Sequence, residues 1–225
     1  LGVDCFRVDV AHSLIKANGL PDEDATIDRS YFNLGPMWDQ DGVHDIYRRW
    51  RKVLEEYDGD RVLVAEAWVP DPERLARYVR SDEMHQAFNF DFLTSAWDAA
   101  SYRKVITETM AANAAVGAPT TWVLSNHDVV RHATRLARED PSDTGGIAAT
   151  DPQPDAALGL RRARAATLMM LALPGSAYLY QGEELGLPEH TAVPDHLRQD
   201  PIWFRSGHQE VGRDGCRIPM PWVAD

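Results

Sequence analysis

The chain has 225 residues, a formal net charge of -12 at neutral pH and a hydrophobic content of 44%. A chain of this length and apolar content can bury one substantial core, so a single domain is expected. Its 35 acidic residues against 23 Lys and Arg leave no basic surface that could follow a phosphate backbone, which excludes nucleic acids and anionic membranes as expected partners.

Hydropathy and cysteine content set two further limits. No apolar run reaches the roughly 18 residues that span a bilayer, and the nearest candidate, residues 166–180, is interrupted by Pro174 and Gly175. The two cysteines, Cys5 and Cys216, are too few for a disulfide framework and lack metal-ligand spacing. Cys5 is expected to be a small buried residue. We therefore expect a soluble, cytoplasmic protein with no metal and no cofactor.

Short apolar runs alternate along the chain with longer amphipathic stretches. The short runs predict five strands, at residues 2–11, 61–68, 85–93, 120–128 and 175–184. Helical spacing predicts the helices between them, at residues 41–57, 71–81, 101–115 and 158–173. Asp71 is the expected N-cap of the second helix because it precedes a proline at the first helical position. Three stretches are typical of loops: residues 17–37, 138–156 and the segment beyond residue 185.

Strict alternation of strands and helices predicts an α/β fold with a parallel sheet and right-handed crossovers. Two architectures have this alternation, a doubly wound open sheet and a (β/α)8 barrel. A doubly wound nucleotide-binding sheet would carry a glycine-rich turn after its first strand, and residues 9–16 contain no glycine. The barrel is therefore favoured.

Acidic side chains end three of the predicted strands. Asp9 ends the first strand, Glu66 the second, and the triplet Asn126, His127 and Asp128 the fourth. A single acid in such a place is more often a solvated loop residue or a helix cap. Because the carboxyl ends of parallel strands open on one face, three acids at three strand ends are expected to meet in one cleft.

Two chemistries suit three carboxylates in such a cleft. One is retaining glycoside hydrolysis, in which one carboxylate attacks the anomeric carbon and a second protonates the leaving oxygen. The other is magnesium binding in an enediolate-forming enzyme. Arg7 lies two residues before Asp9, on the same face of the strand, where its charge favours ionised Asp9 and disfavours a metal ion. Asn126 and His127 offer neutral donors to sugar hydroxyls, so glycoside chemistry is the better fit.

Three short blocks carry a family resemblance. CFRVDVAH (5–12), VLVAEAW (62–68) and VLSNHD (123–128) resemble the strand-end motifs of the α-amylase family of glycoside hydrolases, in that family's order. The resemblance implies that Asp9 is the nucleophile, that Glu66 is the general acid/base, and that Asp128 stabilises the transition state by binding ring hydroxyls. It also implies that Arg7 holds Asp9, that His127 holds the sugar and that His12 contacts the neighbouring sugar unit. Asn126 is a further candidate for sugar binding through its neutral donors.

Two later segments, YLYQGEELG (178–186) and GRDGCRIPMPW (212–222), are similar to exo-acting α-glucosidases and oligo-1,6-glucosidases of that family. In those relatives an arginine of the second segment closes the subsite for the non-reducing glucose. Arg213 and Arg217 are both candidates, and the sequence does not separate them. The alternative is that these arginines only solvate a loop.

The resemblance implies a retaining exo-acting α-glucosidase that removes terminal α-linked glucose from malto- and isomalto-oligosaccharides through a covalent glycosyl-enzyme. Maltose-type α-1,4 linkages are the first choice. An oligo-1,6-glucosidase is an alternative, since Val10 after the nucleophile is of the type seen there. Trehalose- or sucrose-acting transglycosylases use the same three acids. They are a further alternative, because water and sugar compete for the same glycosyl-enzyme intermediate. A non-catalytic partner of a membrane transporter is the alternative of another class. Such proteins have lost their catalytic acids, whereas all three acids are present here. A magnesium-dependent lyase would lose activity with a chelator.

The resemblance runs from the fourth barrel strand to just past the eighth, so residues 1–225 are expected to be the C-terminal part of a catalytic barrel. The family's block after the third strand, its inserted domain, its calcium-binding segments and its C-terminal β domain have no counterpart here. A barrel reduced to five strands has two unpaired edges. We therefore expect the isolated chain to be poorly soluble and inactive, and to require the missing remainder of its own catalytic domain as a partner.

Overall fold

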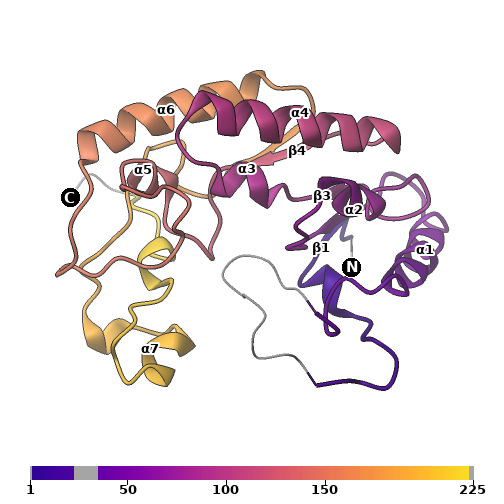
Figure 1. Cartoon of the computed structure of the whole chain (residues 1–225), viewed down its shortest axis with the longest axis horizontal. Helices are drawn as coiled ribbons and strands as arrows, with labels where there is room; N and C mark the ends of the chain where they lie inside the picture. Colours follow the sequence, from indigo (N-terminus) through magenta and orange to yellow (C-terminus); the bar gives the residue numbers. More distant parts are fainter. Residues whose placement is uncertain (1, 23–34, 223–225) are drawn as a thin grey trace. The chain divides into compact units, whose positions relative to one another are not determined.

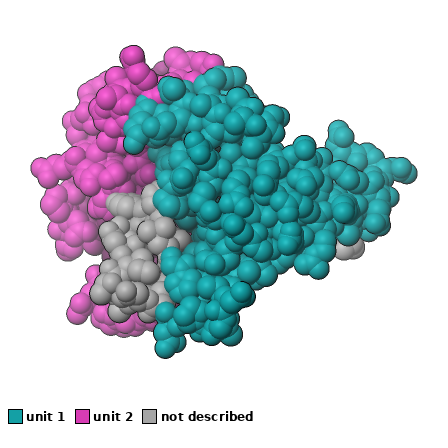
Figure 2. Space-filling model, turned by 45° about the vertical axis from the view of Figure 1, so that its right-hand side comes forward, with its two compact units in different colours: residues 1–91, 104–121, 174–176 teal, residues 92–103, 122–173, 177–225 magenta. Residues whose placement is uncertain are grey.

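The computed structural model describes residues 2–22 and 35–222, so the loop expected at 17–37 lies partly outside the described residues (Figure 1). The chain divides into two compact units, which Figure 2 draws in different colours. Unit 1 consists of residues 1–91, 104–121 and 174–176. Unit 2 consists of residues 92–103, 122–173 and 177–225. No helix in the described ranges is both long and apolar enough to cross a lipid bilayer.

Unit 1 is built on a parallel three-stranded sheet. Its strands are β1 (Cys5–Val8), β2 (Val62–Ala65) and β3 (Gln86–Ala87), in the spatial order β1-β2-β3. Two helices connect them, α1 (Val43–Leu54) and α2 (Pro72–Arg77). The predicted parallel alternation of strands and helices is therefore confirmed for this unit, and it places the carboxyl ends of β1 and β2 at the same edge of the sheet.

Local sequence signals explain where α2 begins. The Asp71 carboxylate accepts the main-chain N–H of Glu73 at 2.8 Å, and Pro72 occupies the first helical position. The predicted N-cap is therefore confirmed, because these contacts satisfy donors that a helix start leaves unpaired.

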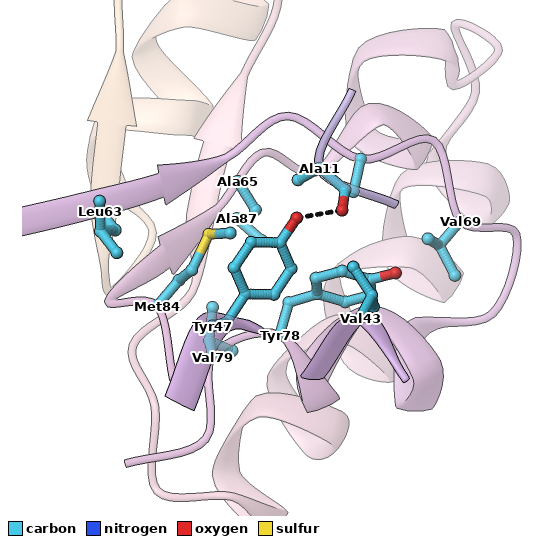
Figure 3. Packing of buried hydrophobic residues seen from close by; sticks show 11 residues of the cluster. Ala11, Val43, Tyr47, Leu63, Ala65, Val69, Tyr78, Val79, Met84 and Ala87 are labelled. Carbon is cyan, nitrogen blue, oxygen red and sulfur yellow. Dashed lines mark hydrogen bonds between the residues drawn. The ribbon is translucent and has the colours of Figure 1, made fainter. Parts of the chain in front are cut away.

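The core of unit 1 packs α1 and α2 against the sheet and the turn after β1 (Figure 3). Tyr47 on α1 is fully buried, and its hydroxyl donates a hydrogen bond to the Ala11 carbonyl. The ring of Tyr78 lies 5.9 Å from that of Tyr47. This bond fastens to the core the short 3-10 turn η1 (Ala11–Ser13), which directly follows Asp9 and Val10. The buried members of the core are Ala11, Val43, Tyr47, Leu63, Ala65, Ala67, Val69, Tyr78, Val79, Met84 and Ala87.

Replacing Tyr47 with phenylalanine should lower the free energy of unfolding by about 1–2 kcal/mol, because the buried Ala11 carbonyl loses its donor. Tyr57→Phe is the matched control, since Tyr57 is exposed, and it should change stability by less than about 0.5 kcal/mol. Chemical denaturation of the complete gene product followed by far-UV circular dichroism measures both. Equal stability of the two variants would contradict the role given to the Tyr47 hydroxyl.

The regular elements of unit 2 are mainly helices, separated by long segments without regular structure, and some elements belong partly to each unit. Helix α6 (Ala156–Ala172) lies in unit 2, whereas α4 (Ala99–Ala115) begins in unit 2 and belongs to unit 1 from Lys104 onward. Asp155 caps α6 by accepting the N–H of Leu158 at 2.9 Å. The strands β4 (Thr121–Val123) and β5 (Ser176–Tyr178) form a second sheet. The shorter elements are α3 (Phe90–Thr94), α5 (His132–Arg135), η2 (Asp195–Leu197), α7 (Pro201–Arg205) and η3 (Asp214–Cys216).

The strand predicted at residues 85–93 is wrong over most of its length. Only Gln86–Ala87 is a strand, and Phe90–Thr94 forms the helix α3. Phe90 stacks on Trp68 at 4.0 Å between ring centroids, and the fully buried Phe92 lies 5.1 Å from Trp122. A short alternation of aromatic and polar residues fits a strand or a helix equally well, so tertiary packing of the rings decides.

The environment predicted for Cys5 is also wrong, because Cys5 is exposed. Among the strands that the structure describes, β1 pairs only with β2, so its other edge is open. The next residue, Phe6, is 55% exposed.

Candidate active site

In unit 1 the register of the sheet brings Asp9 and Glu66 to the ends of neighbouring strands. Val8 lies opposite Ala65 in the parallel pairing of β1 with β2. The ladder continues one step further, because the Glu66 N–H donates to the Val8 carbonyl at 3.0 Å and the Ala11 N–H donates to the Glu66 carbonyl at 2.7 Å. Both acids therefore follow directly on adjacent parallel strands, where this architecture gathers functional side chains.

Arg7 lies beside both carboxylates. Its Nη1 donates to Asp9 Oδ1 at 2.7 Å, and its Nη2 is 4.0 Å from Glu66 Oε2. The Asp9 side chain is 70% exposed, whereas that of Glu66 is 7% exposed. One acid is thus open to solvent and paired with a guanidinium, and the other is buried next to the same cation.

The environment of Glu66 suits a proton donor. Burial raises the pKa of Glu66, and the Val10 N–H and the Arg7 charge partly offset this rise. The Val10 N–H donates to Glu66 Oε2 at 2.6 Å. Val10 has φ 44° and ψ 47°, a left-handed conformation that is unusual for a β-branched residue. This strained turn also ends β1 at Val8, short of the predicted end at residue 11, and it aims a main-chain donor at the carboxylate.

In unit 2 Asp128 is the centre of a cluster of polar contacts. Its Oδ1 accepts bonds from Arg213 Nη1 at 2.7 Å and from Arg217 Nη2 at 2.9 Å. Its Oδ2 lies 3.3 Å from His127 Nε2. The Asn126 side chain accepts the Asp128 N–H at 2.8 Å, which fixes the turn after β4. Arg213 and Arg217, which the sequence does not separate, both bind Asp128, so the alternative that they only solvate a loop is wrong.

Asp200 belongs to the same cluster and was not predicted from the sequence. It is 2% exposed and accepts Arg213 Nε at 2.6 Å. Burial alone would raise the pKa of Asp200, but hydrogen bonds from Arg213 and from the Ile202 N–H lower it to about 2. The Asp200-Pro201 pair could have been recognised as a helix start, yet nothing in it indicates the arginine partner.

His12, predicted to contact the sugar, is fully buried in the structure. Its ring stacks on Trp38 with 5.2 Å between centroids. Burial lowers the pKa of His12 to about 4, so the imidazole is neutral at physiological pH. His12 therefore packs in the interior, within the turn η1 that follows Asp9 and Val10, and is not exposed on an open surface.

In residues 2–22 and 35–222 no group of three or more His, Cys, Asp or Glu side chains is arranged to hold a metal ion. Asp9 and Asp128 instead bind guanidinium groups, whose positive charge would oppose a cation at the same oxygens.

In unit 1, parallel β/α units carry Asp9 and Glu66 just beyond the ends of adjacent strands, beside Arg7, which is typical of α/β proteins with a functional site at the carboxyl ends of their strands. The family model of the α-amylase catalytic domain matches residues 1–225, so the chain belongs to the α-amylase family. Its fold is therefore part of a (β/α)8 barrel.

The chain is also similar to individual proteins whose names fit the α-amylase family. The chain is 29% identical to a probable alpha-glucosidase of Rhizobium meliloti (strain 1021), over 98% of this chain and 40% of that protein. It is 30% identical to Maltase A1 of Drosophila melanogaster, over 99% of this chain and 39% of that protein. The crystal structure of an alpha-glucosyl transfer enzyme, XgtA, superimposes with a TM-score of 0.75 and 28% identity, over 99% of this chain and 40% of that one. The chain thus spans about 40% of the length of these relatives.

Proposed function

We propose that this chain supplies the catalytic carboxylates of a retaining exo-acting α-glucosidase that removes terminal α-linked glucose from malto- and isomalto-oligosaccharides. The observation that carries the proposal is the contrast between two acids on adjacent strands. Asp9 is open to solvent and paired with Arg7, whereas Glu66 is buried and its pKa is raised. A retaining glycosidase needs this division into an ionised nucleophile and a protonated acid. The α-glucosidase and maltase relatives support the choice of substrate.

In the first step Asp9 attacks the anomeric carbon while the bond from that carbon to the leaving oxygen breaks. Glu66 gives its proton to the leaving oxygen, so the departing sugar leaves as a neutral alcohol and Glu66 becomes a carboxylate. The product on the enzyme is an ester between Asp9 and glucose. Arg7, which binds Asp9 before the attack, orients the attacking carboxylate.

In the second step the Glu66 carboxylate takes a proton from water, and the resulting hydroxide attacks the anomeric carbon. The bond to Asp9 breaks, glucose leaves with its original anomeric configuration, and Glu66 is protonated again. The Val10 N–H stabilises the Glu66 carboxylate during the interval between the two steps, because it donates to Oε2.

Asp128 is proposed to bind ring hydroxyls of the same glucose and to stabilise the oxocarbenium-like transition state. Arg213 and Arg217, which hold its Oδ1, would keep it oriented. Asp9 and Glu66 lie in unit 1 and Asp128 lies in unit 2, so the meeting of all three at one glucose stays a prediction. The assignment of the strands as the fourth to the eighth of the barrel is a proposal on the same footing.

Transglycosylation is the second candidate function. A sugar hydroxyl that replaces water in the second step turns hydrolysis into glucosyl transfer, with the same residues in the same roles. The structural neighbour XgtA, described as an alpha-glucosyl transfer enzyme, favours this candidate. Product analysis with maltose as donor and acceptor separates the two outcomes, since transfer yields trisaccharides and hydrolysis yields only glucose.

The test of the proposed function is turnover by the complete gene product of maltose, isomaltose, sucrose, trehalose and p-nitrophenyl α-glucoside. We expect α-glucosidase activity, with maltose ahead of isomaltose, and α-glucose as the first anomer seen by proton NMR. Absence of turnover on all five substrates, or β-glucose as the first product, would overturn the proposal.

A further inference from the structure

Asp200, a buried carboxylate with no part in the bond-making steps above, anchors one of the arginines at Asp128. It lies before α7, and its Oδ1 accepts the Ile202 N–H at 3.0 Å. Its Oδ2 accepts two donors of the same residue, the main-chain N–H of Arg213 at 2.9 Å and Nε of Arg213 at 2.6 Å. One carboxylate thus holds Arg213 by its backbone and by its side chain at once.

Hydrogen bonds run in both directions between the segment at residues 199–200 and the segment at residues 213–214. The Asp214 carboxylate accepts the N–H groups of Gln199 and Asp200 at 3.1–3.2 Å, while Asp200 accepts the N–H of Arg213. The approach is so close that a Cβ at Gly212 would lie 2.8 Å from Asp200 Cγ, and Gly212 has φ +62°. Glycine at this position is therefore required for the contact.

The contact with Asp200 restricts the conformation of the exposed guanidinium group of Arg213. The Arg213 side chain is 40% exposed, whereas that of Asp200 is 2% exposed. An exposed arginine side chain normally loses rotamer entropy when it is held in one conformation. Because Nε at 2.6 Å and Nη2 at 3.4 Å both donate to the Asp200 carboxylate, the planar guanidinium is held in an orientation in which Nη1 donates to Asp128 Oδ1. Both arginines bind Oδ1, and Oδ2 remains directed to the side of the exposed His127 ring.

We propose that Asp200 is a positioning residue that acts through Arg213 to orient Asp128, so that Oδ2 of Asp128 meets the sugar hydroxyls. The inference rests on the proposed function, because it assigns to Asp200 the support of a residue that binds substrate. Asp200 itself does not touch the sugar. Its loss should therefore weaken transition-state stabilisation more than substrate binding.

The first test is Asp200→Asn, which keeps a good helix N-cap but removes the charge that holds Arg213 Nε. We expect kcat to fall by about 10–100-fold, with KM changed by less than about threefold. Asp155→Asn is the matched control, because Asp155 is also an N-cap aspartate of unit 2 and its carboxylate accepts the Leu158 N–H. The control should keep wild-type kcat. Wild-type kcat in a folded Asp200→Asn variant would overturn the inference.

A double-mutant cycle with Arg213→Lys tests whether Asp200 acts through Arg213. If it does, the double variant Asp200→Asn/Arg213→Lys has the same kcat as Arg213→Lys alone, since the fixed guanidinium is already lost. Losses of kcat that multiply would overturn the inference, as expected for a residue with a merely structural role. Asp200→Ser, which also retains a cap, replaces Asp200→Asn in both experiments if the asparagine variant does not fold.

Failure of the inference is distinguishable from failure of the proposed function. A wild-type protein without turnover of any α-glucoside refutes the function, and the inference with it. An active wild type that Asp9→Ala inactivates, together with an Asp200→Asn variant of unchanged kcat, refutes the inference alone.

Discussion

Asp9→Ala should reduce kcat on p-nitrophenyl α-glucoside by roughly 10⁴-fold or more, because the covalent intermediate can no longer form. The protein should still fold, since the Asp9 side chain is 70% exposed and its bond to Arg7 is a surface ion pair. Steady-state kinetics together with a thermal melt of the same sample separate loss of chemistry from loss of structure.

The matched control for this prediction is Asp4→Ala. Asp4 is also an exposed aspartate beside β1, and it binds Arg61 Nη1 at 2.8 Å. Its removal deletes an ion pair of the same kind and should leave kcat within about twofold of wild type. An Asp9→Ala variant that keeps most of its rate, or an Asp4→Ala variant as inactive as Asp9→Ala, would refute the assignment of Asp9 as the nucleophile.

Glu66→Gln should lower kcat/KM on maltose by about 10²–10⁴-fold, and the loss should be smaller on p-nitrophenyl α-glucoside. Nitrophenolate leaves readily without a proton, whereas the sugar oxygen of maltose needs one, so the ratio of the two losses identifies a proton donor. The pH dependence of kcat/KM provides an independent test of the acid/base role. Burial raises the pKa of Glu66, and the acid must be protonated, so wild-type kcat/KM should fall as pH rises through that raised pKa.

In Glu66→Gln this alkaline limb should disappear, because glutamine does not titrate. Glu189→Gln is the matched control, since Glu189 is also buried, its pKa is raised to about 7 by burial, and it accepts a main-chain N–H, that of Arg131. The control should keep the wild-type pH profile. Equal losses on the two substrates in Glu66→Gln, with the alkaline limb retained, would contradict the acid/base role.

Much of the fold could be predicted because it depends on local pattern. The apolar runs at β1 and β2, the amphipathic α1 and the cap at Asp71 are each encoded within a few consecutive residues. The acids could be placed at strand ends by the same local reasoning, since Asp9 and Glu66 directly follow their apolar runs. The pairing of Arg7 with Asp9 followed from a separation of two residues.

The tertiary structure alone decided the features that depend on distant contacts. The sequence by itself determined the parallel β/α alternation of unit 1, the positions of Asp9 and Glu66 after their strands, and the family. The pattern predicted a strand over residues 85–93, whereas Phe90–Thr94 is a helix whose Phe90 and Phe92 rings pack on Trp68 and Trp122. It also left Arg213 and Arg217 equivalent and gave no sign of the Asp200 anchor. Arg213 and Asp128 are 85 residues apart, and periodicity over a few residues carries no information about which side chains the folded chain brings together.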